Sequence, residues 1–340
     1  MTQARSVIVD TKITRWYHCV SRCVRKAFLL SKKEGFDRKA WIDERLKLLD
    51  GIFGVSVAGF SVMDNHLHVL LRIEVDEVEA WSAMEVVERW LRICPPRVAR
   101  KPVSVTRQEK EALAQDTEWI AEMRSRLGSI SWFMKYLKEP LSRLINKEED
   151  CSGTLFEKRF QSIALLDEES ILATATYIDL NPLAANVVIY PEDALHTSIK
   201  ERVDHLLAEG RLKDVQQIRN GSVPAQQVSE GLEDDFWLIP IENRKQQGAK
   251  RVGIKEGFTL GQYLQLVDYT SRLVREGKNS VAADAPPLLE RLSIPPDRWG
   301  RRLLNLVEKP KLIGSFMAST PSRLREVAEK LGRKRLISTA

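Results

Sequence analysis

The sequence predicts an α+β fold, in which an antiparallel β-sheet is covered by helices and followed by a mostly helical region. The first observation is the order strand, helix, strand, strand, helix, strand, helix between about residues 15 and 182. The second is a change of pattern after about residue 195, where helical segments are joined by polar connections.

The first three strands and the first helix are predicted between residues 15 and 73. Arg15–Arg22 reads as a strand, and Arg38–Gly51 has apolar residues at helical spacing. Val55–Met63 and His66–Ile73 read as two further strands, and Asp64-Asn65 between them is typical of a tight turn. These two strands are therefore expected to form an antiparallel hairpin.

The second half of the predicted unit follows a charged stretch at residues 75–127, which we interpret as an insertion with helical segments around Val78–Ile93. Ser129–Asn146 has the apolar face of an amphipathic helix. A short strand is predicted at Gln161–Leu166. Asp167 is a good N-cap for the next helix, which is expected to end at Pro182.

This order matches a ferredoxin-like β-α-β-β-α-β unit with one added helix. We therefore predict a catalytic domain at 12–194 and a helical C-terminal region at 195–340. Helices are expected there at about Ser198–Glu209, Leu260–Glu276 and Ser322–Leu331, with an exposed linker at Glu242–Gly257. The last helix lies in a basic segment, so a DNA-binding role for 195–340 is one hypothesis and an ordinary basic surface is the other.

Composition limits the class of protein. The 340 residues are 43% hydrophobic and 29% charged, as in a globular protein in water. No stretch is apolar enough for a membrane span, and no signal peptide is visible. The four cysteines form no CxxC pair, which fits a reducing cytosol. The net charge of +6 is compatible with nucleic acid and equally with a solvated basic surface.

The first candidate site is the sequence Asn65-His66-Leu67-His68. Side chains alternate along a strand, so His66 and His68 point the same way, with their Cα atoms about 6.6 Å apart. Two imidazoles at this spacing can bind one metal ion and leave positions open for phosphate and water. By itself the pair is also compatible with two ordinary histidines.

The second candidate site is Tyr177 with Asn181, which share one face of the predicted helix because they are four residues apart. A tyrosine hydroxyl can attack a phosphodiester once the target is polarised. Asn181 or Asp179 could give the metal an oxygen ligand. A lone tyrosine near a helix end is more often a packing residue.

Basic residues flank both sites. Arg22, Arg25 and Lys26 follow the first strand, and Lys158 and Arg159 precede the last one. Such side chains could hold phosphates beside a scissile bond, although each taken singly is more often an ordinary surface charge. The nearby aromatic residues Trp132, Phe156 and Phe160 could stack on bases, but core packing is the more common role.

Taken together and in this order, four segments resemble the single-tyrosine HUH transposases and, within them, the REP-associated tyrosine transposases. They are YHCVSR (17–22), MDNHLHVLL (63–71), GTLFEKRF (153–160) and YIDLNPLAA (177–185). The resemblance covers roughly residues 12–190, interrupted by the insertion. The combination is far more specific than any one motif.

The resemblance implies a ferredoxin-like domain in which His66 and His68 bind Mg²⁺ or Mn²⁺, Asn181 helps to ligate the metal, and Tyr177 is the catalytic nucleophile. It implies cleavage of single-stranded DNA with a 5′-phosphotyrosine link and a free 3′-OH, beside DNA hairpins. Because histidine is not the usual ligand of Mg²⁺, Mn²⁺ should work at least as well. The general base is not identified, and His18 is a weak candidate.

The chain also departs from the family pattern. Ala184 stands where a basic residue is frequent, and the insertion and residues 195–340 lie outside the shared core. Two other hypotheses stay open: a non-catalytic or domesticated DNA-hairpin-binding protein, and an unrelated metal hydrolase in which Tyr177 has no role. A nucleoid-associated cytoplasmic location is expected, and a homodimer is left open.

Overall fold

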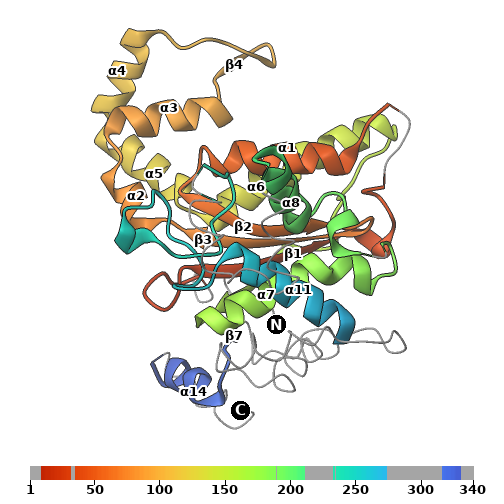
Figure 1. Ribbon diagram of the computed structural model, residues 1–340. Coiled ribbons are helices and arrows are strands. Elements are labelled where there is room, and N and C mark those ends of the chain that lie inside the picture. Colours follow the sequence, from red (N-terminus) through yellow and green to blue (C-terminus); the bar gives the residue numbers. More distant parts are fainter. Residues whose placement is uncertain are drawn as a thin grey trace.

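The computed structural model describes residues 9–31, 35–188, 190–210, 233, 235–273 and 316–330. It confirms the predicted α+β class: a five-stranded sheet lies between two groups of helices (Figure 1). The strand order is β2-β3-β1-β6-β7.

The sheet consists of β1 (Trp16–Arg22), β2 (Val55–Val62), β3 (His66–Ile73), β6 (Gln161–Leu165) and β7 (Phe316–Met317). The first four pair antiparallel with their neighbours, and the predicted hairpin of β2 and β3 is confirmed. β7 was not predicted, because two residues are too few to give a pattern. It pairs parallel with β6, so the sheet is mixed.

Two helices, α1 (Arg38–Asp50) and α6 (Ile130–Glu148), cover one face of the sheet, and α7 (Glu168–Ala184) covers the other (Figure 1). Asp37 caps α1 by accepting hydrogen bonds from Lys39 N and Ala40 N. On the α1/α6 face, buried residues of the helices and strands form one hydrophobic core cluster. A second cluster joins α7 to the other face of the sheet.

The predicted insertion is a group of short elements beside the sheet (Figure 1). It contains α2 (Val75–Ala80), α3 (Ala83–Ile93), the ribbon of β4 (Arg97–Val98) and β5 (Lys101–Pro102), α4 (Arg107–Gln115) and α5 (Thr117–Leu127). The helical stretch expected around Val78–Ile93 is divided between α2 and α3. Ser82 separates them and caps α3 in a capping box with Glu85.

The predicted end at Pro182 of the helix that carries Tyr177 is wrong, because α7 continues to Ala184. Proline removes a hydrogen bond to the preceding turn, but its fixed φ is compatible with a helix, so the following residues can stay helical. Here Ala185 N donates to Asn181 O at 3.0 Å and closes the last turn. Leu183 is buried, which favours the two extra helical residues.

The C-terminal residues that the structure describes pack on both hydrophobic core clusters. They include α8 (Ser198–Ala208), α11 (Leu260–Leu273) and α14 (Pro321–Lys330). Ile199, Leu206 and Leu266 belong to the α7 core cluster, and β7 extends the sheet. Val327 of α14 belongs to the α1/α6 core cluster. The division between 194 and 195 stays a prediction, and described residues from both sides of it occur in both core clusters.

The predicted exposed linker Glu242–Gly257 is wrong for its second half. Ile254 is buried in the α7 core cluster, and Arg251 forms an ion pair with Asp50 of α1 at 2.9 Å. Gly253 permits this packing, since a Cβ there would lie 2.1 Å from Glu242 O. Polar side chains made the stretch look solvated, although one isoleucine anchors it.

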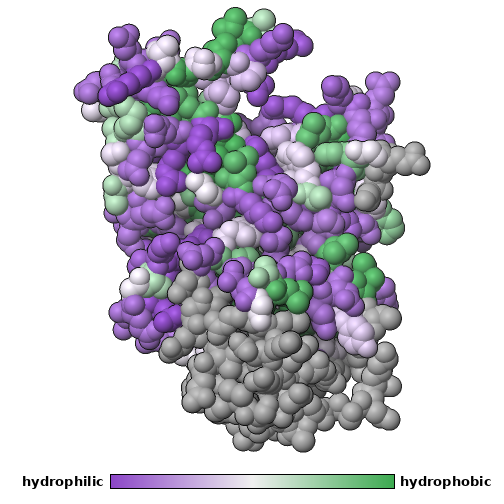
Figure 2. Space-filling view, turned by 45° about the horizontal axis from the view of Figure 1, so that its top comes forward, coloured by the Kyte–Doolittle hydropathy of each residue, from purple (hydrophilic) through white to green (hydrophobic). Residues whose placement is uncertain are grey.

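Part of the expected C-terminal features lies outside the described residues. These are the end of the helix at 260–276, the residue Leu331 that ends the last predicted helix, and most of the basic segment 301–340. Within α14, Arg323 is paired with Glu326 at 2.5 Å. No helix among the described residues is long and apolar enough to cross a membrane. The face in Figure 2 is largely hydrophilic, with hydrophobic residues in scattered patches.

Candidate active site

The candidate site lies between α7 and one end of the sheet, and the N-terminus of α7 sets its position. Asp167 caps the helix by accepting a hydrogen bond from Ser170 N at 2.8 Å. The helix is buried on nearly all sides, so its polar side chains must find partners inside the protein. Tyr177 and Asn181 meet the histidines of β3.

His66 and His68 project from β3 toward α7, while the residues between and after them face the other core. Leu67, Val69 and Leu71 belong to the α1/α6 core cluster, as strand alternation requires. The two imidazole rings are nearly perpendicular, with centroids 4.9 Å apart. His68 is buried, whereas His66 is half-buried at the end of the strand.

Asn181 and Tyr177 complete the cluster. Asn181 Nδ2 lies 3.4 Å from His68 Nε2, and the same amide group hydrogen-bonds His66 and Tyr177. The Tyr177 ring is edge-on to His68 with centroids 5.5 Å apart. The structure therefore brings together the four residues predicted for catalysis and metal binding.

Two further residues orient the histidines. His18 of β1 stacks on His68, and its Nε2 lies 2.9 Å from His68 Nδ1. Asn65 Oδ1 accepts a hydrogen bond from His66 Nδ1 at 2.6 Å. These contacts engage Nδ1 of each predicted ligand, as is usual around metal-binding histidines. Nε2 of His68 faces Asn181 Nδ2, so it could bind a metal only after that amide turns.

His18 was considered as a base and Asn65 as a turn residue, so sequence reasoning missed both positioning roles. The available signal was strand alternation, which places His18 and Arg22 on one face of β1. The pairing of β1 with β3, which brings that face beside His68, could not be deduced from the motif.

The environment keeps the imidazoles neutral. Burial lowers the pKa of His18 to about 3, and burial also lowers the pKa of His66 and of His68. The positive charge of Arg22 acts in the same direction on His66 and His68. A neutral imidazole has a lone pair for a metal ion. The low pKa makes His18 a weak proton acceptor, so the structure does not support it as the base.

Tyr177 is set up as a phenol rather than a phenolate. Burial raises its pKa, and the hydrogen bond with Asn181 and the charge of Arg22 oppose that rise only in part. The side chain is half-buried. Attack on phosphorus therefore requires that the phenolic proton leave as the new bond forms.

The donor set fits a divalent ion that accepts nitrogen ligands. His66 and His68 supply two neutral imidazoles, and Asn181 supplies an amide whose oxygen would have to turn toward the ion. Among the described residues, no group of three or more His, Cys, Asp or Glu side chains is arranged as a metal site. With two imidazoles and one amide as its ligands, an ion here would keep positions for water or phosphate, and imidazole suits Mn²⁺ better than Mg²⁺.

Asp179, the other candidate oxygen ligand, does not belong to this cluster. Its carboxylate is buried on the other side of α7, where it accepts hydrogen bonds from Ser198 Oγ, Ile199 N and Tyr263 Oη. Side chains two positions apart on a helix point about 200° away from each other. Asp179 is two positions from both Tyr177 and Asn181, so it lies on the opposite face of α7 from them.

The five predicted DNA-binding residues lie in neighbouring exposed segments at the same end of the sheet. Arg22 is the last residue of β1, and it lies opposite His66 in the pairing of β1 with β3. Arg25 and Lys26 form a short turn tied to the site by Asn65 Nδ2, which donates to Lys26 O at 3.2 Å. Lys158 and Arg159 follow Glu157, whose N donates to Arg22 O at 2.9 Å.

The aromatic residues near these cations have packing roles. Phe156 and Phe160 are buried in the α1/α6 core cluster, and Trp132 is half-buried against it. Base stacking by the two phenylalanines is therefore not supported.

Comparison with known proteins yields one structural likeness. No family model matches the chain, and no curated protein does. A solved structure described as a REP-associated tyrosine transposase bound to a REP hairpin is 10% identical, with a TM-score of 0.34. The match covers 56% of this chain and 78% of that one. At this level of similarity, the roles of individual residues rest on the geometry of the site.

Proposed function

We propose that this chain is a metal-dependent tyrosine nuclease and strand transferase that acts on single-stranded DNA, as a transposase of the HUH type does. One observation carries the proposal: His66, His68 and Asn181 converge on the hydroxyl-bearing Tyr177 at an end of the sheet bordered by exposed cations. The strand order β2-β3-β1-β6, with antiparallel neighbours, supports the predicted ferredoxin-like unit.

The reaction would be a transfer of one phosphoryl group. Tyr177 Oη attacks the phosphorus, the phenolic proton is lost, and the bond from phosphorus to the 3′ oxygen breaks. The 3′ oxygen takes up a proton and becomes a free hydroxyl, while the 5′ phosphate stays on Tyr177. The reverse attack by a 3′-OH rejoins or transfers the strand without a nucleotide cofactor.

His66 and His68 would hold the metal ion, with Asn181 as the third ligand. When bound, Mg²⁺ or Mn²⁺ would stabilise the charge that develops on the phosphate oxygens. His18 and Asn65 orient the two imidazoles. Arg22 is near enough to affect the pKa of Tyr177 and would bind the phosphate beside the cleaved bond.

The DNA partner is a single strand next to a hairpin, held by Arg22, Arg25, Lys26, Lys158 and Arg159. Tyr177 lies beside the histidines of its own chain, which supports attack within one protomer. A homodimer is not needed to assemble the site.

The decisive experiment uses labelled single-stranded DNA that contains hairpins, incubated with the protein and Mn²⁺ and separated on a denaturing gel. We expect a covalent protein–DNA band that disappears in Tyr177→Phe and on chelation of the metal. Tyr190→Phe is the matched control, since Tyr190 is an exposed tyrosine outside the cluster. Its band should equal that of the parent.

The experiment separates the competing hypotheses. Binding of the hairpin with no covalent band in any metal would favour a non-catalytic DNA-binding protein. Cleavage that persists in Tyr177→Phe would contradict the tyrosine mechanism and favour a metal hydrolase that uses water.

A further inference from the structure

A basic groove lies on the opposite side of the sheet from Tyr177, between α6 and residues 153–160. Its cavity volume is about 530 Å³. The charged side chains that line it are Lys135, Lys138, Glu139, Glu157, Lys158 and Arg159. Cations therefore outnumber acids by four to two along the groove, and Glu139 is further paired with Arg143 outside it.

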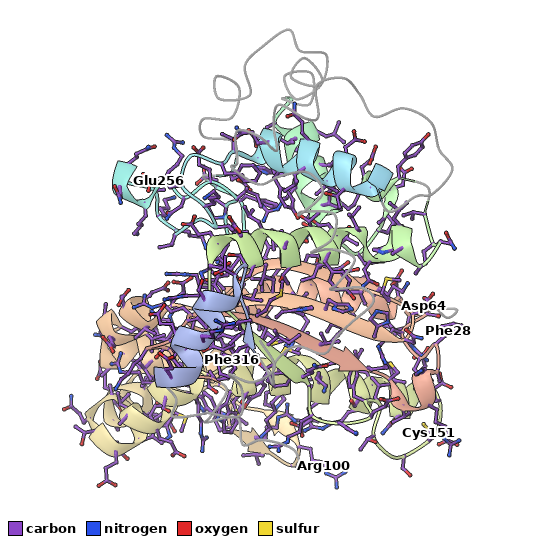
Figure 3. All side chains as sticks on the ribbon, turned by 90° about the horizontal axis from the view of Figure 1, so that it is seen from below. Phe28, Asp64, Arg100, Cys151, Glu256 and Phe316 are labelled. Carbon is purple, nitrogen blue, oxygen red and sulfur yellow. The ribbon has the colours of Figure 1, made fainter. Side chains whose placement is uncertain are left out.

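Hydrogen bonds connect this groove to the site around the end of the sheet. Cys23, next to Arg22, forms a β-bridge with Phe156, and Glu157 N donates to Arg22 O at 2.9 Å. In Figure 3, Asp64 and Phe28 mark the end of the sheet where the site lies, and Cys151 lies below the sheet on the α6 side. Lys158 and Arg159 belong both to the cations beside the site and to the lining of the groove.

The lysines of α6 that line the groove have defined contacts. Lys138 Nζ from α6 is 3.4 Å from Lys158 O and 4.5 Å from the centroid of the Phe156 ring. One helical turn earlier, Lys135 Nζ is 4.4 Å from the centroid of the Trp132 ring, and Arg126 is stacked at 4.5 Å from the same ring. Aromatic contacts keep these cations at the protein surface in defined positions.

We propose that this groove binds the phosphate backbone of the DNA that continues from the cleaved strand, with Lys135 and Lys138 of α6 as contacts. The inference rests on the proposed function, because DNA is its occupant. Closely spaced cations along a groove fit a polyanion with regularly spaced charges. The DNA would pass from Tyr177 around the end of β1 and along α6.

The test measures binding apart from cleavage. Labelled hairpin DNA with single-stranded tails is titrated with Tyr177→Phe protein, and the affinity is followed by fluorescence anisotropy at several salt concentrations. Each lost phosphate contact should lower the slope of log affinity against log salt by about 0.7–0.9. The double variant Lys135→Gln/Lys138→Gln should therefore lower the slope by about 1.5.

Two controls keep the result specific. Lys245→Gln/Lys250→Gln removes the same charge from an exposed C-terminal segment outside the groove, and it should leave the slope unchanged. Lys135→Arg/Lys138→Arg keeps both charges and should bind like the parent. Thermal melts of each variant verify folding.

The proposed role of the groove would be contradicted if Lys135→Gln/Lys138→Gln had the same slope as the parent. It would also be contradicted if Lys245→Gln/Lys250→Gln lowered the slope by the same amount. The proposed function fails separately: if no covalent product forms with Tyr177 intact while the groove variant still lowers the slope, the chain binds DNA there without cutting it. If Tyr177 forms the covalent product and the Lys135→Gln/Lys138→Gln variant keeps the slope of the parent, only the proposal for the groove is wrong.

Discussion

The two sides of α7 use buried polar groups in opposite ways. On one side, Asp179 accepts from Ser198, Ile199 and Tyr263, and both of its oxygens have partners. On the other side, Asn181 lies against His66 and His68, and its amide nitrogen faces Nε2 of His68. The first side holds α8 and α11 to the helix, whereas the second carries the half-buried His66 and Tyr177 at the end of the sheet.

The difference shows how a buried polar cluster can be judged from its hydrogen bonds. A cluster in which each group has a partner stabilises the fold, because an unpaired buried group would cost free energy. A cluster of neutral imidazole ligands that has positively charged neighbours and access from the surface is suited to bind a metal ion and, through it, an anion. Perturbed pKa values alone do not distinguish the two kinds of cluster, because burial shifts the pKa in both: it raises that of Asp179 and lowers that of His68.

The largest effect should come from Asp179→Ala. This change leaves a buried hydroxyl of Ser198, the backbone N–H of Ile199 and the hydroxyl of Tyr263 without their acceptor, and should lower the free energy of unfolding by about 3 kcal/mol. Urea unfolding measures it. In contrast, Asn181→Ala should lose Mn²⁺ affinity with much less change in stability. If Asp179→Ala reduced Mn²⁺ affinity of the folded protein and left stability unchanged, the comparison would be reversed.

The next effect concerns His18, which holds His68 without belonging to the predicted ligand set. His18→Phe keeps an aromatic ring in the buried space but removes the nitrogen beside His68 Nδ1. Loss of such an orienting partner typically weakens metal binding about 10–100-fold. Isothermal titration with Mn²⁺ measures the affinity, and a circular dichroism melt verifies the fold. An unchanged affinity would show that His18 only fills space.

The smallest effect is a pH dependence of stability in the metal-free protein. Because the pKa of buried His18 is lowered to about 3, the unfolded chain binds a proton there below about pH 6.5 and the folded chain does not. This stability is present above pH 6.5 and is lost as pH falls toward the folded value. Between pH 7 and 5.5, His18 should account for about 1 kcal/mol.

The measurement is urea unfolding at both pH values for the parent and for His18→Phe. The variant should lose about 1 kcal/mol less than the parent on acidification, since the phenyl ring takes up no proton. Equal losses would mean that His18 is protonated in the folded protein and is not buried as described.

Much of the fold could be predicted because local patterns were strong. The hairpin of β2 and β3 follows from two strands with Asp64-Asn65 between them, and α7 follows from its capping residue Asp167. Errors arose where a local signal met tertiary packing. Pro182 suggested a helix end, but buried Leu183 favours two more helical residues. Polar neighbours concealed the anchoring role of Ile254.

The candidate site was predictable to a similar extent. Strand alternation alone placed His66 and His68 on one face, and helical spacing placed Tyr177 with Asn181. These local patterns could not show that the histidine face of β3 meets the Tyr177 face of α7, because that contact depends on how α7 packs on the sheet. Nor could they show that Asp179 turns away, since the partners Ser198 and Tyr263 are remote in sequence.

By itself the sequence determined the α+β class, the chain order of its main elements and the residue types available for chemistry, because these depend on interactions among neighbouring residues. Only the tertiary structure decided which side chains are partners. Pairing of β1 with β3 brought His18 to His68, and burial between sheet and helix made the imidazoles neutral. Protonation, orientation and access depend on contacts between remote residues, which spacing along the chain does not contain.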